Sequence, residues 1–113
     1  MKTVKEYIVS LQQDIIKLDA LIELLETQYE LLSQRNVQLE THNKKMLGFL
    51  ESLNESHNQR DGFLVSLGLQ GGKEGLAQLT ALLPADINSL TTKLLHQLEL
   101  KTKTCKIMNE RSE

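Results

Sequence analysis

Apolar residues recur at alternating steps of four and three along the first third of the chain. This seam comprises Val4, Ile8, Leu11, Ile15, Leu18, Ile22, Leu25, Tyr29 and Leu32. A repeat of this kind is typical of a long helix that packs lengthwise on another helix. We therefore expect a first helix over about residues 2–33.

A second apolar set lies between the positions of this seam. It comprises Val9, Ile16, Ala20, Leu24 and Leu31. Because each helical residue advances by about 100°, these positions fall nearly opposite the seam. The first helix is thus expected to have two apolar faces. The second face needs a cover, which is either a third helix of the same chain or a partner.

The seam continues in phase beyond the first helix, but with polar residues among its members. These are Asn36, Leu39, Asn43, Met46, Leu50, Leu53, His57, Arg60, Leu64 and Leu67. The polar residues 33–36 divide the segment into two arms of about 30 residues each. Equal arms favour an antiparallel hairpin, with Asn36 as the N-cap of a second helix over about residues 37–67. A continuous rod stays open, because residues 33–36 contain neither Gly nor Pro.

Glycine and proline divide the remainder of the chain. Four of the six glycines fall in residues 68–75, which predicts a loop, and a short helix over 76–83 then ends before Pro84. Asp86 is expected to cap a third helix over about 86–111. Its apolar stripe consists of Ile87, Leu90, Leu94, Leu98, Cys105 and Met108. The predicted fold is a single all-α domain, residues 1–113, in which a long antiparallel hairpin is followed by a short helix and a C-terminal helix.

Composition narrows the classes of function. Aromatic residues make up 4% of the chain and Trp is absent, so the core must be built from Leu and Ile on long helices. A net charge of −2 provides no basic field for nucleic acid. The sequence contains no run of about 18 apolar residues, so it does not predict membrane insertion. The single cysteine allows no internal disulfide, and we expect a cytoplasmic protein.

Charge is distributed unevenly between the two ends of the chain. Residues 1–32 carry six acidic and three basic side chains, whereas residues 93–111 carry five basic and two acidic ones. The two ends are expected to attract each other or to steer different partners.

Residues with catalytic or ligand chemistry are present but do not form a recognisable site. The glycine-rich segment lacks the spacing and the preceding strand of a phosphate-binding loop. The histidines have no ligand partners at helical spacing, and His57 with Arg60 is interpreted as a polar layer that sets register. Cys105 is interpreted as a small buried or interface side chain. We expect no catalytic residues, no cofactor and no metal site, and therefore no enzyme.

The order of motifs resembles the FlgN family of flagellar export chaperones. The matching segments are LDALIELLETQYELL, KKMLGFLESLNESHNQRDGFLVSLG, GLAQLTALLP and CKIMNERSE. The resemblance covers nearly the whole chain. It rests most on the spacing of Leu50, Leu53 and Arg60, followed by Leu64 and Gly68, and on the end centred on Asn109.

The resemblance implies a cytoplasmic chaperone that binds the C-terminal helical segments of the hook–filament junction proteins FlgK and FlgL before their export. Components of the export gate are further candidate partners. The client surface of the family lies largely on its last helix, which nominates here Leu90, Leu94, Leu98, Cys105, Met108 and Asn109. The alternative is a structural coiled-coil protein that forms homo-oligomers through the seam and has no client.

Overall fold

The chain folds into four helices, and the predicted all-α class is confirmed. The computed structural model describes residues 1–34 and 39–111. The helices are α1 (Val4–Gln34), α2 (Leu39–Ser66), α3 (Gly72–Ala81) and α4 (Ala85–Arg111), and the described residues contain no strand. The proposed N-cap Asn36 lies outside the described residues.

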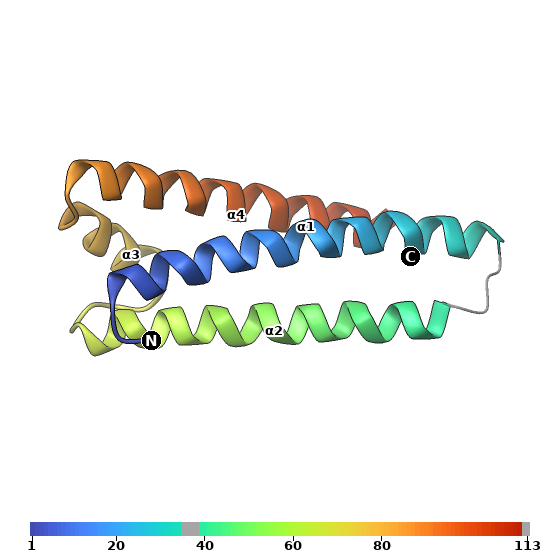
Figure 1. The fold of residues 1–113 in the computed structure, drawn as a ribbon, viewed down its shortest axis with the longest axis horizontal. Coiled ribbons are helices and arrows are strands. Elements are labelled where there is room, and N and C mark those ends of the chain that lie inside the picture. Colours follow the sequence, from blue (N-terminus) through green and yellow to red (C-terminus); the bar gives the residue numbers. More distant parts are fainter. Residues whose placement is uncertain (35–38, 112–113) are drawn as a thin grey trace.

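The first two long helices form an antiparallel hairpin, and the alternative of a continuous rod is wrong (Figure 1). The molecule extends 52 Å along its longest axis. A single helix of about 65 residues would be about 98 Å long, since each residue adds about 1.5 Å. Helix α4 starts at the α3 end of the bundle and lies beside α1, so the predicted C-terminal helix packs on the hairpin.

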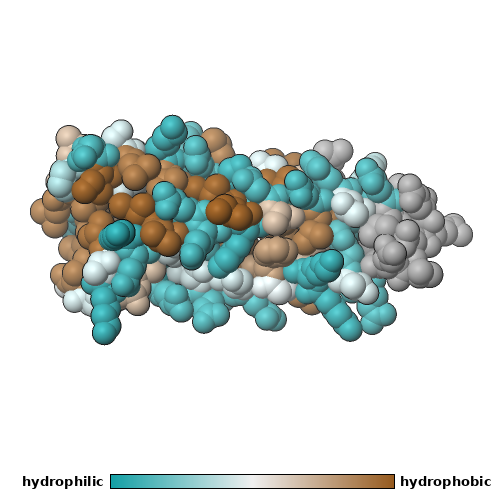
Figure 2. Space-filling model, viewed as in Figure 1, coloured by the Kyte–Doolittle hydropathy of each residue, from teal (hydrophilic) through white to brown (hydrophobic). Residues whose placement is uncertain are grey.

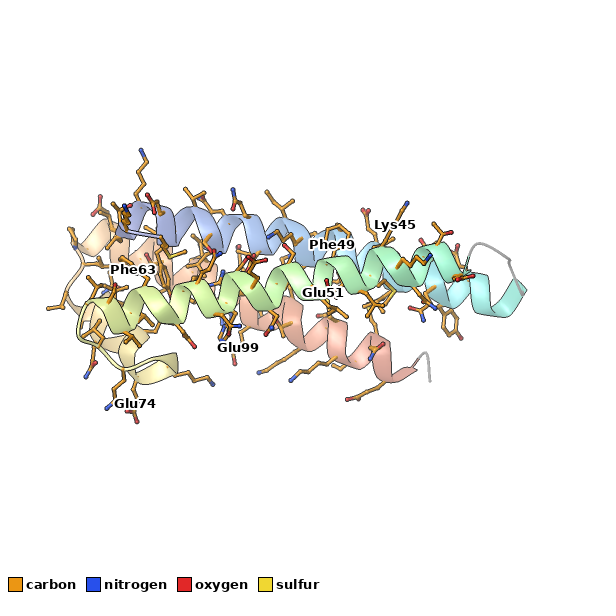
Figure 3. The ribbon with its side chains drawn as sticks, turned by 90° about the horizontal axis from the view of Figure 1, so that it is seen from below. Lys45, Phe49, Glu51, Phe63, Glu74 and Glu99 are labelled. Carbon is orange, nitrogen blue, oxygen red and sulfur yellow. The ribbon has the colours of Figure 1, made fainter. Side chains whose placement is uncertain are left out.

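Helix α1 is the central element of the bundle. It packs against α2 on one side and against α4 on another, whereas no Cα atoms of the described parts of α2 and α4 lie within 8 Å of each other. Figures 1 and 3, seen at right angles, show that the three long helices do not lie in one plane. Helix α3 contacts both α2 and α4 at one end of the bundle.

The seam predicted for α1 lies in the core, but the buried face is wider than predicted. Leu11, Leu18 and Leu25 are buried. The positions directly before the other seam residues Ile8, Ile15 and Ile22 are buried as well, and these are Tyr7, Asp14 and Leu21. The face is wider because two helices, rather than one, pack on α1.

The second apolar face of α1 is only partly covered. Ile16 is 68% exposed and Val9 is also exposed, whereas Ala20 and Leu24 are half-buried. The side chain of Leu31 lies outside the described residues. Apolar and hydrophilic side chains are mixed on the face of the molecule viewed in Figure 2. Part of this second face, including Ile16, is therefore exposed to solvent.

Helix α2 buries only part of the seam that continues in phase from α1. Asn43, Leu50, His57 and Leu67 belong to that seam and are exposed. The side chains of α2 that pack into the core are the seam residues Met46, Leu53, Arg60 and Leu64, together with His42, Phe49 and Phe63. The two helices are separate rods, so the turn between them need not preserve the phase of the repeat.

One ring contact fixes the orientation of α2 against α1. The rings of Tyr7 and Phe63 are both buried, with centroids 5.9 Å apart and an interplanar angle of 44°. Aromatic pairs favour such tilted geometry over face-to-face stacking. Phe63 thus occupies the core position that the in-phase seam did not provide.

The glycine-rich segment contains more helix than predicted. Gly68 ends α2 with a positive φ of 81°, and the Leu69 and Gly68 amides donate to the Leu64 and Val65 carbonyls in a Schellman motif. Helix α3 then begins at Gly72, inside the predicted loop 68–75, and ends at Ala81 rather than at residue 83. The Gly72 amide donates to Asp61 Oδ1 at 3.2 Å, a long-range contact that sequence patterns do not reveal.

The C-terminal helix begins one residue before the predicted start. Helix α4 starts at Ala85, and the Asn88 amide donates to the carbonyl of Pro84. Asp86 is therefore in the first turn instead of at the N-cap, and its carboxylate accepts from the Ile87 amide. A carboxylate in the first turn still stabilises the positive end of the helix dipole.

Gly75 permits the close approach of α3 to the preceding loop. A Cβ at this position would lie 1.6 Å from the carbonyl oxygen of Gln70. We expect Gly75→Ala to lower the free energy of unfolding by about 1–3 kcal/mol, because α3 must shift to relieve the clash. Gly48→Ala is the control, since no atom lies within 4 Å of a Cβ there, and it should stabilise by about 0.5–1 kcal/mol. Urea unfolding followed by circular dichroism measures both, and a Gly75→Ala variant as stable as the parent would contradict this packing.

Burial of Tyr7 gives the fold a dependence on alkaline pH. Burial raises the pKa of the Tyr7 phenol above its ordinary value of 10.0. The folded state therefore holds the phenol proton more tightly than the unfolded chain. This contribution to stability is complete below about pH 10 and is lost as pH rises through the raised pKa. Between neutral pH and a pH above about 10, the free energy of unfolding should therefore fall less in the Tyr7→Phe variant than in the parent chain. Urea unfolding at both pH values measures the two losses. Equal losses in the variant and the parent would contradict the prediction.

Candidate helix-binding groove

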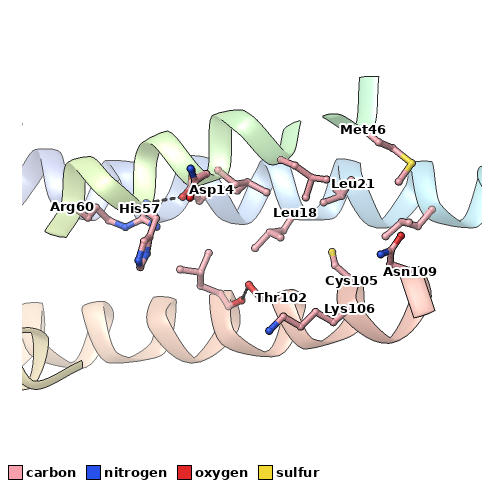
Figure 4. Close-up of a pocket in the computed structure, with 15 residues that line it drawn as sticks. Asp14, Leu18, Leu21, Met46, His57, Arg60, Thr102, Cys105, Lys106 and Asn109 are labelled. Atoms are coloured by element: carbon pink, nitrogen blue, oxygen red, sulfur yellow. Dashed lines mark hydrogen bonds and ion pairs between the residues drawn. The ribbon is translucent and has the colours of Figure 1, made fainter. Parts of the chain in front are cut away.

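An open groove runs between α2 and α4, with α1 as its floor. Its main section has a volume of about 370 Å³. The residues that line it are Asp14, Leu18, Leu21 and Leu25 from α1, Met46, Leu50, Leu53, Asn54, His57 and Arg60 from α2, and Leu98, Thr102, Cys105, Lys106 and Asn109 from α4. In Figure 4, side chains of α1 and α4 point into the same space from opposite sides.

Each of the three helices presents a stripe with coiled-coil spacing to this groove. Steps of four and three separate Asp14, Leu18, Leu21 and Leu25 on α1, then Met46, Leu50, Leu53, His57 and Arg60 on α2, and Leu98, Thr102, Cys105 and Asn109 on α4. Such stripes form the inner faces of four-helix bundles. Three helices of the described chain thus surround one groove with stripes of this spacing.

The groove continues from this main section towards α3. A second section of about 820 Å³ shares His57, Arg60, Leu98, Thr102 and Lys106 with the first. Its apolar walls are formed by Leu64, Leu76, Ala77 and Leu95. On α4 the two sections together reach from Thr92 to Asn109, which are 17 residues apart and so about 26 Å along the helix axis. The groove is therefore about five helical turns long.

A buried ion pair lies where the two sections meet. Arg60 Nη1 donates to Asp14 Oδ2 at 2.6 Å and to the Ser10 hydroxyl at 2.9 Å. Asp14 is 1% exposed and Arg60 is 5% exposed. Asp14 Oδ1 accepts no hydrogen bond, although the Lys17 ammonium lies 3.5 Å away. The predicted polar layer exists, but it joins Arg60 to Asp14, whereas His57 is exposed beside Asp61.

The rim of the groove is positively charged. Lys73, Lys103 and Lys106 face it, together with the acidic residues Asp61 and Glu99. Glu99 pairs with Lys103 at 3.3 Å, and Asp61 lies 3.4 Å from His57. Lys73 and Lys106 form no ion pair with any described residue. The rim therefore has positive charge available for an acidic partner.

The structure brings three of the six predicted partner-binding residues to the groove. Leu98, Cys105 and Asn109 line the main section. Met108 is half-buried and lines a neighbouring hollow with Leu25, Tyr29 and Ile107.

The other two residues lie elsewhere. Leu94 is 9% exposed and belongs to the core cluster with Tyr7, Leu11 and Phe63. Leu90 is exposed and lines neither section of the groove. The C-terminal stripe is thus divided between core, groove and solvent.

Sequence reasoning assigned no binding role to the groove residues of α1 and α2. The in-phase seam of α2 includes Met46 and Leu50, and the structure places the buried Met46 and the exposed Leu50 on the groove. The sequence signal for these two residues was the four-and-three repeat, which continues in phase from α1 into α2. Asp14 gave no signal, because its partner Arg60 is 46 residues away.

Cys105 is a groove side chain without the features of an activated nucleophile. Burial raises the pKa of its thiol above the ordinary value of 9.0; Asp19 raises the pKa further, and Lys101 opposes these effects. The thiol is therefore mostly protonated at neutral pH and is not an activated nucleophile. No group of three or more His, Cys, Asp or Glu side chains in the described part of the chain is placed to hold a metal ion.

None of the helices in residues 1–34 and 39–111 is both long and apolar enough to cross a membrane. Comparisons with protein-family models, with curated proteins and with solved structures find no match. The geometry and charge of the groove are therefore the main basis for a functional proposal.

Proposed function

We propose that the protein binds an amphipathic helix of another protein in the groove and holds it as the fourth helix of a bundle. The observation that carries this proposal is the convergence of three stripes with coiled-coil spacing on one apolar channel. A helix that fills the channel would cover the exposed Leu50 and the half-buried Leu53 and Leu98. Each Leu that becomes buried contributes about 1.5–3 kcal/mol before the costs of association.

The proposed role is that of an export chaperone of the FlgN type. Its clients would be the C-terminal helical segments of the junction proteins FlgK and FlgL, which it would keep from premature assembly in the cytoplasm. The sequence resemblance supports this choice of client, and the length and the apolar lining of the groove support the binding of a single helix. A few buried side chains give an affinity that is specific yet reversible without ATP.

The structural alternative is self-association without a client. In this alternative the chain forms homo-oligomers and holds no other protein. A second copy of the chain in the groove remains the competing occupant. Sedimentation of the free chain over a range of concentrations distinguishes a client helix from a second copy as the occupant. A dimer that forms without the client and prevents the client segment from binding would favour self-association.

Titration with a C-terminal segment of a junction protein tests the proposal. Isothermal calorimetry should give one segment per chain, and circular dichroism should show a gain in helix. The absence of heat at about 10–100 μM would contradict the proposed client, since this range detects even weak specific binding.

A matched pair of variants tests the groove. Leu50 is 48% exposed and lines the groove, so Leu50→Glu should leave the fold intact but weaken segment binding about tenfold or more. Leu47→Glu is the control, because Leu47 is also exposed on α2 but does not line the groove. Equal effects of the two substitutions on the affinity would argue against this site.

A further inference from the structure

We infer that the groove selects helices that carry one acidic residue within their apolar stripe, at the position that faces Arg60. This inference rests on the proposed binding of a helix and specifies the partner further. It derives from the hydrogen-bonding groups at the junction of the two groove sections.

Any helix that occupies the whole groove must pass Arg60. Arg60 lines both sections, with Leu18, Leu21 and Leu53 on one side and Leu64, Leu76 and Leu95 on the other. The groove is thus two apolar segments separated by one polar layer. A matching helix needs apolar residues at both ends and a different residue between them.

Arg60 has donors that the chain does not use. A guanidinium has five N–H groups, and those of Arg60 that form hydrogen bonds belong to Nη1 alone. Nε and Nη2 have no hydrogen-bond partner among the described residues. An apolar side chain packed over Arg60 would displace water from these donors without offering an acceptor, and this loss of hydrogen bonds would weaken binding. A hydrogen-bond acceptor on the bound helix would satisfy them.

Charge favours a carboxylate over a neutral acceptor. The groups that face this junction are Asp14 from α1, His57, Arg60 and Asp61 from α2, Lys73 from α3, and Glu99, Lys103 and Lys106 from α4. Asp14, Asp61 and Glu99 already lie beside Arg60, His57 and Lys103, respectively. Lys106 supplies the additional positive charge that a carboxylate of the bound helix would offset. Charge-assisted hydrogen bonds to guanidinium are also stronger than neutral ones.

A single polar layer also fixes how the helix lies in the groove. In coiled coils, one buried polar position specifies register, because every shifted alignment leaves it facing apolar side chains. An acidic residue opposite Arg60 would have the same effect here. Shifting the helix by one heptad would place the carboxylate among leucines and an apolar side chain over Arg60.

Three synthetic peptides test this inference. Each is an amphipathic helix of about 18 residues, about 27 Å long, with a Leu stripe at steps of four and three and an acidic outer face. They differ only at the central stripe position, which is Glu, Gln or Leu. Fluorescence anisotropy with the full chain should rank the affinities Glu, Gln, Leu, with the Leu peptide about 10- to 100-fold weaker than the Glu peptide.

A variant protein separates the polar layer from general charge attraction. In Asp14→Leu/Arg60→Met the layer is apolar, and the Leu peptide should now bind more tightly than the Glu peptide. Circular dichroism confirms that this variant is folded. Bound peptide should also slow the alkylation of Cys105 in the parent chain, because the thiol lines the groove.

The outcomes distinguish the two levels of the proposal. Failure of all three peptides to bind the parent chain would contradict helix binding itself. Equal affinity for the three peptides, with Cys105 protected, would leave the groove as the binding site and overturn the selection of an acidic residue. If the parent chain bound the Leu peptide most tightly, that result would also overturn the selection of an acidic residue.

Discussion

Removing either Asp14 or Arg60 alone is expected to lower the free energy of unfolding by about 3–5 kcal/mol, whereas replacing both by apolar residues should cost much less than the sum. The reason is burial, since these side chains are 1% and 5% exposed. Arg60→Met leaves a carboxylate without its main partner in the core. Asp14→Leu leaves a guanidinium in the same position.

A double-mutant cycle measures this coupling. The variants are Asp14→Leu, Arg60→Met and the combination, each unfolded with urea. Lys101→Ala is the control, because it removes an ion pair with Asp19 that is largely exposed, and it should cost no more than about 1 kcal/mol. Additive effects of Asp14→Leu and Arg60→Met would show that the pair does not act as a unit.

The long helices could be predicted from the sequence because their signal is local. The repeat from Val4 to Leu25 identifies α1 and its contact face, and the similar lengths of the two arms indicate the hairpin. The rotation of α2 about its axis could not be predicted in the same way. It depends on Phe63 meeting Tyr7, a contact between residues 56 positions apart.

The start of α3 depends on tertiary contacts as well. Glycine disfavours helix, so residues 72–75 read as loop in isolation. In the folded chain, Asp61 holds the amide of Gly72, and Gly75 fits against Gln70 where a larger residue would clash. Local propensity is overridden by contacts that the sequence pattern does not contain.

The uneven charge along the chain has a structural counterpart. Acidic residues of α1 and basic residues of α4 come together because the two helices pack side by side, and Lys101 forms an ion pair with Asp19. This ion pair is one contact between an acidic residue of the first end and a basic residue of the last end. Lys106 points into the groove instead, where it contributes to the positive rim.

Only part of the candidate site could be predicted from the sequence, for a related reason. The apolar stripe of the last helix was identified, but a stripe alone does not reveal which of its residues face the core and which face a groove. That division follows from how α4 lies on α1. Leu98 and Cys105 contact the core and line the groove at once, whereas Leu94 only contacts the core.

Leu94→Glu is expected to lower the free energy of unfolding by more than about 4 kcal/mol, which is most of the stability of a typical small domain. Leu94 is 9% exposed among Tyr7, Leu11 and Phe63, so the carboxylate would be buried without a partner or would force α4 away from α1. Helicity at 25 °C and the midpoint of thermal unfolding, both by circular dichroism, measure the loss.

Leu90→Glu provides the matched control one turn earlier on the same helix. Leu90 is exposed, so this substitution should change stability by no more than about 0.5 kcal/mol. If Leu94→Glu instead kept the parent's stability and abolished binding of the junction-protein segment, Leu94 would be a client contact. Helix α4 would then have to leave α1 when the client binds. The loss of stability that we expect from the buried carboxylate would instead show that α4 forms one fixed wall of the groove.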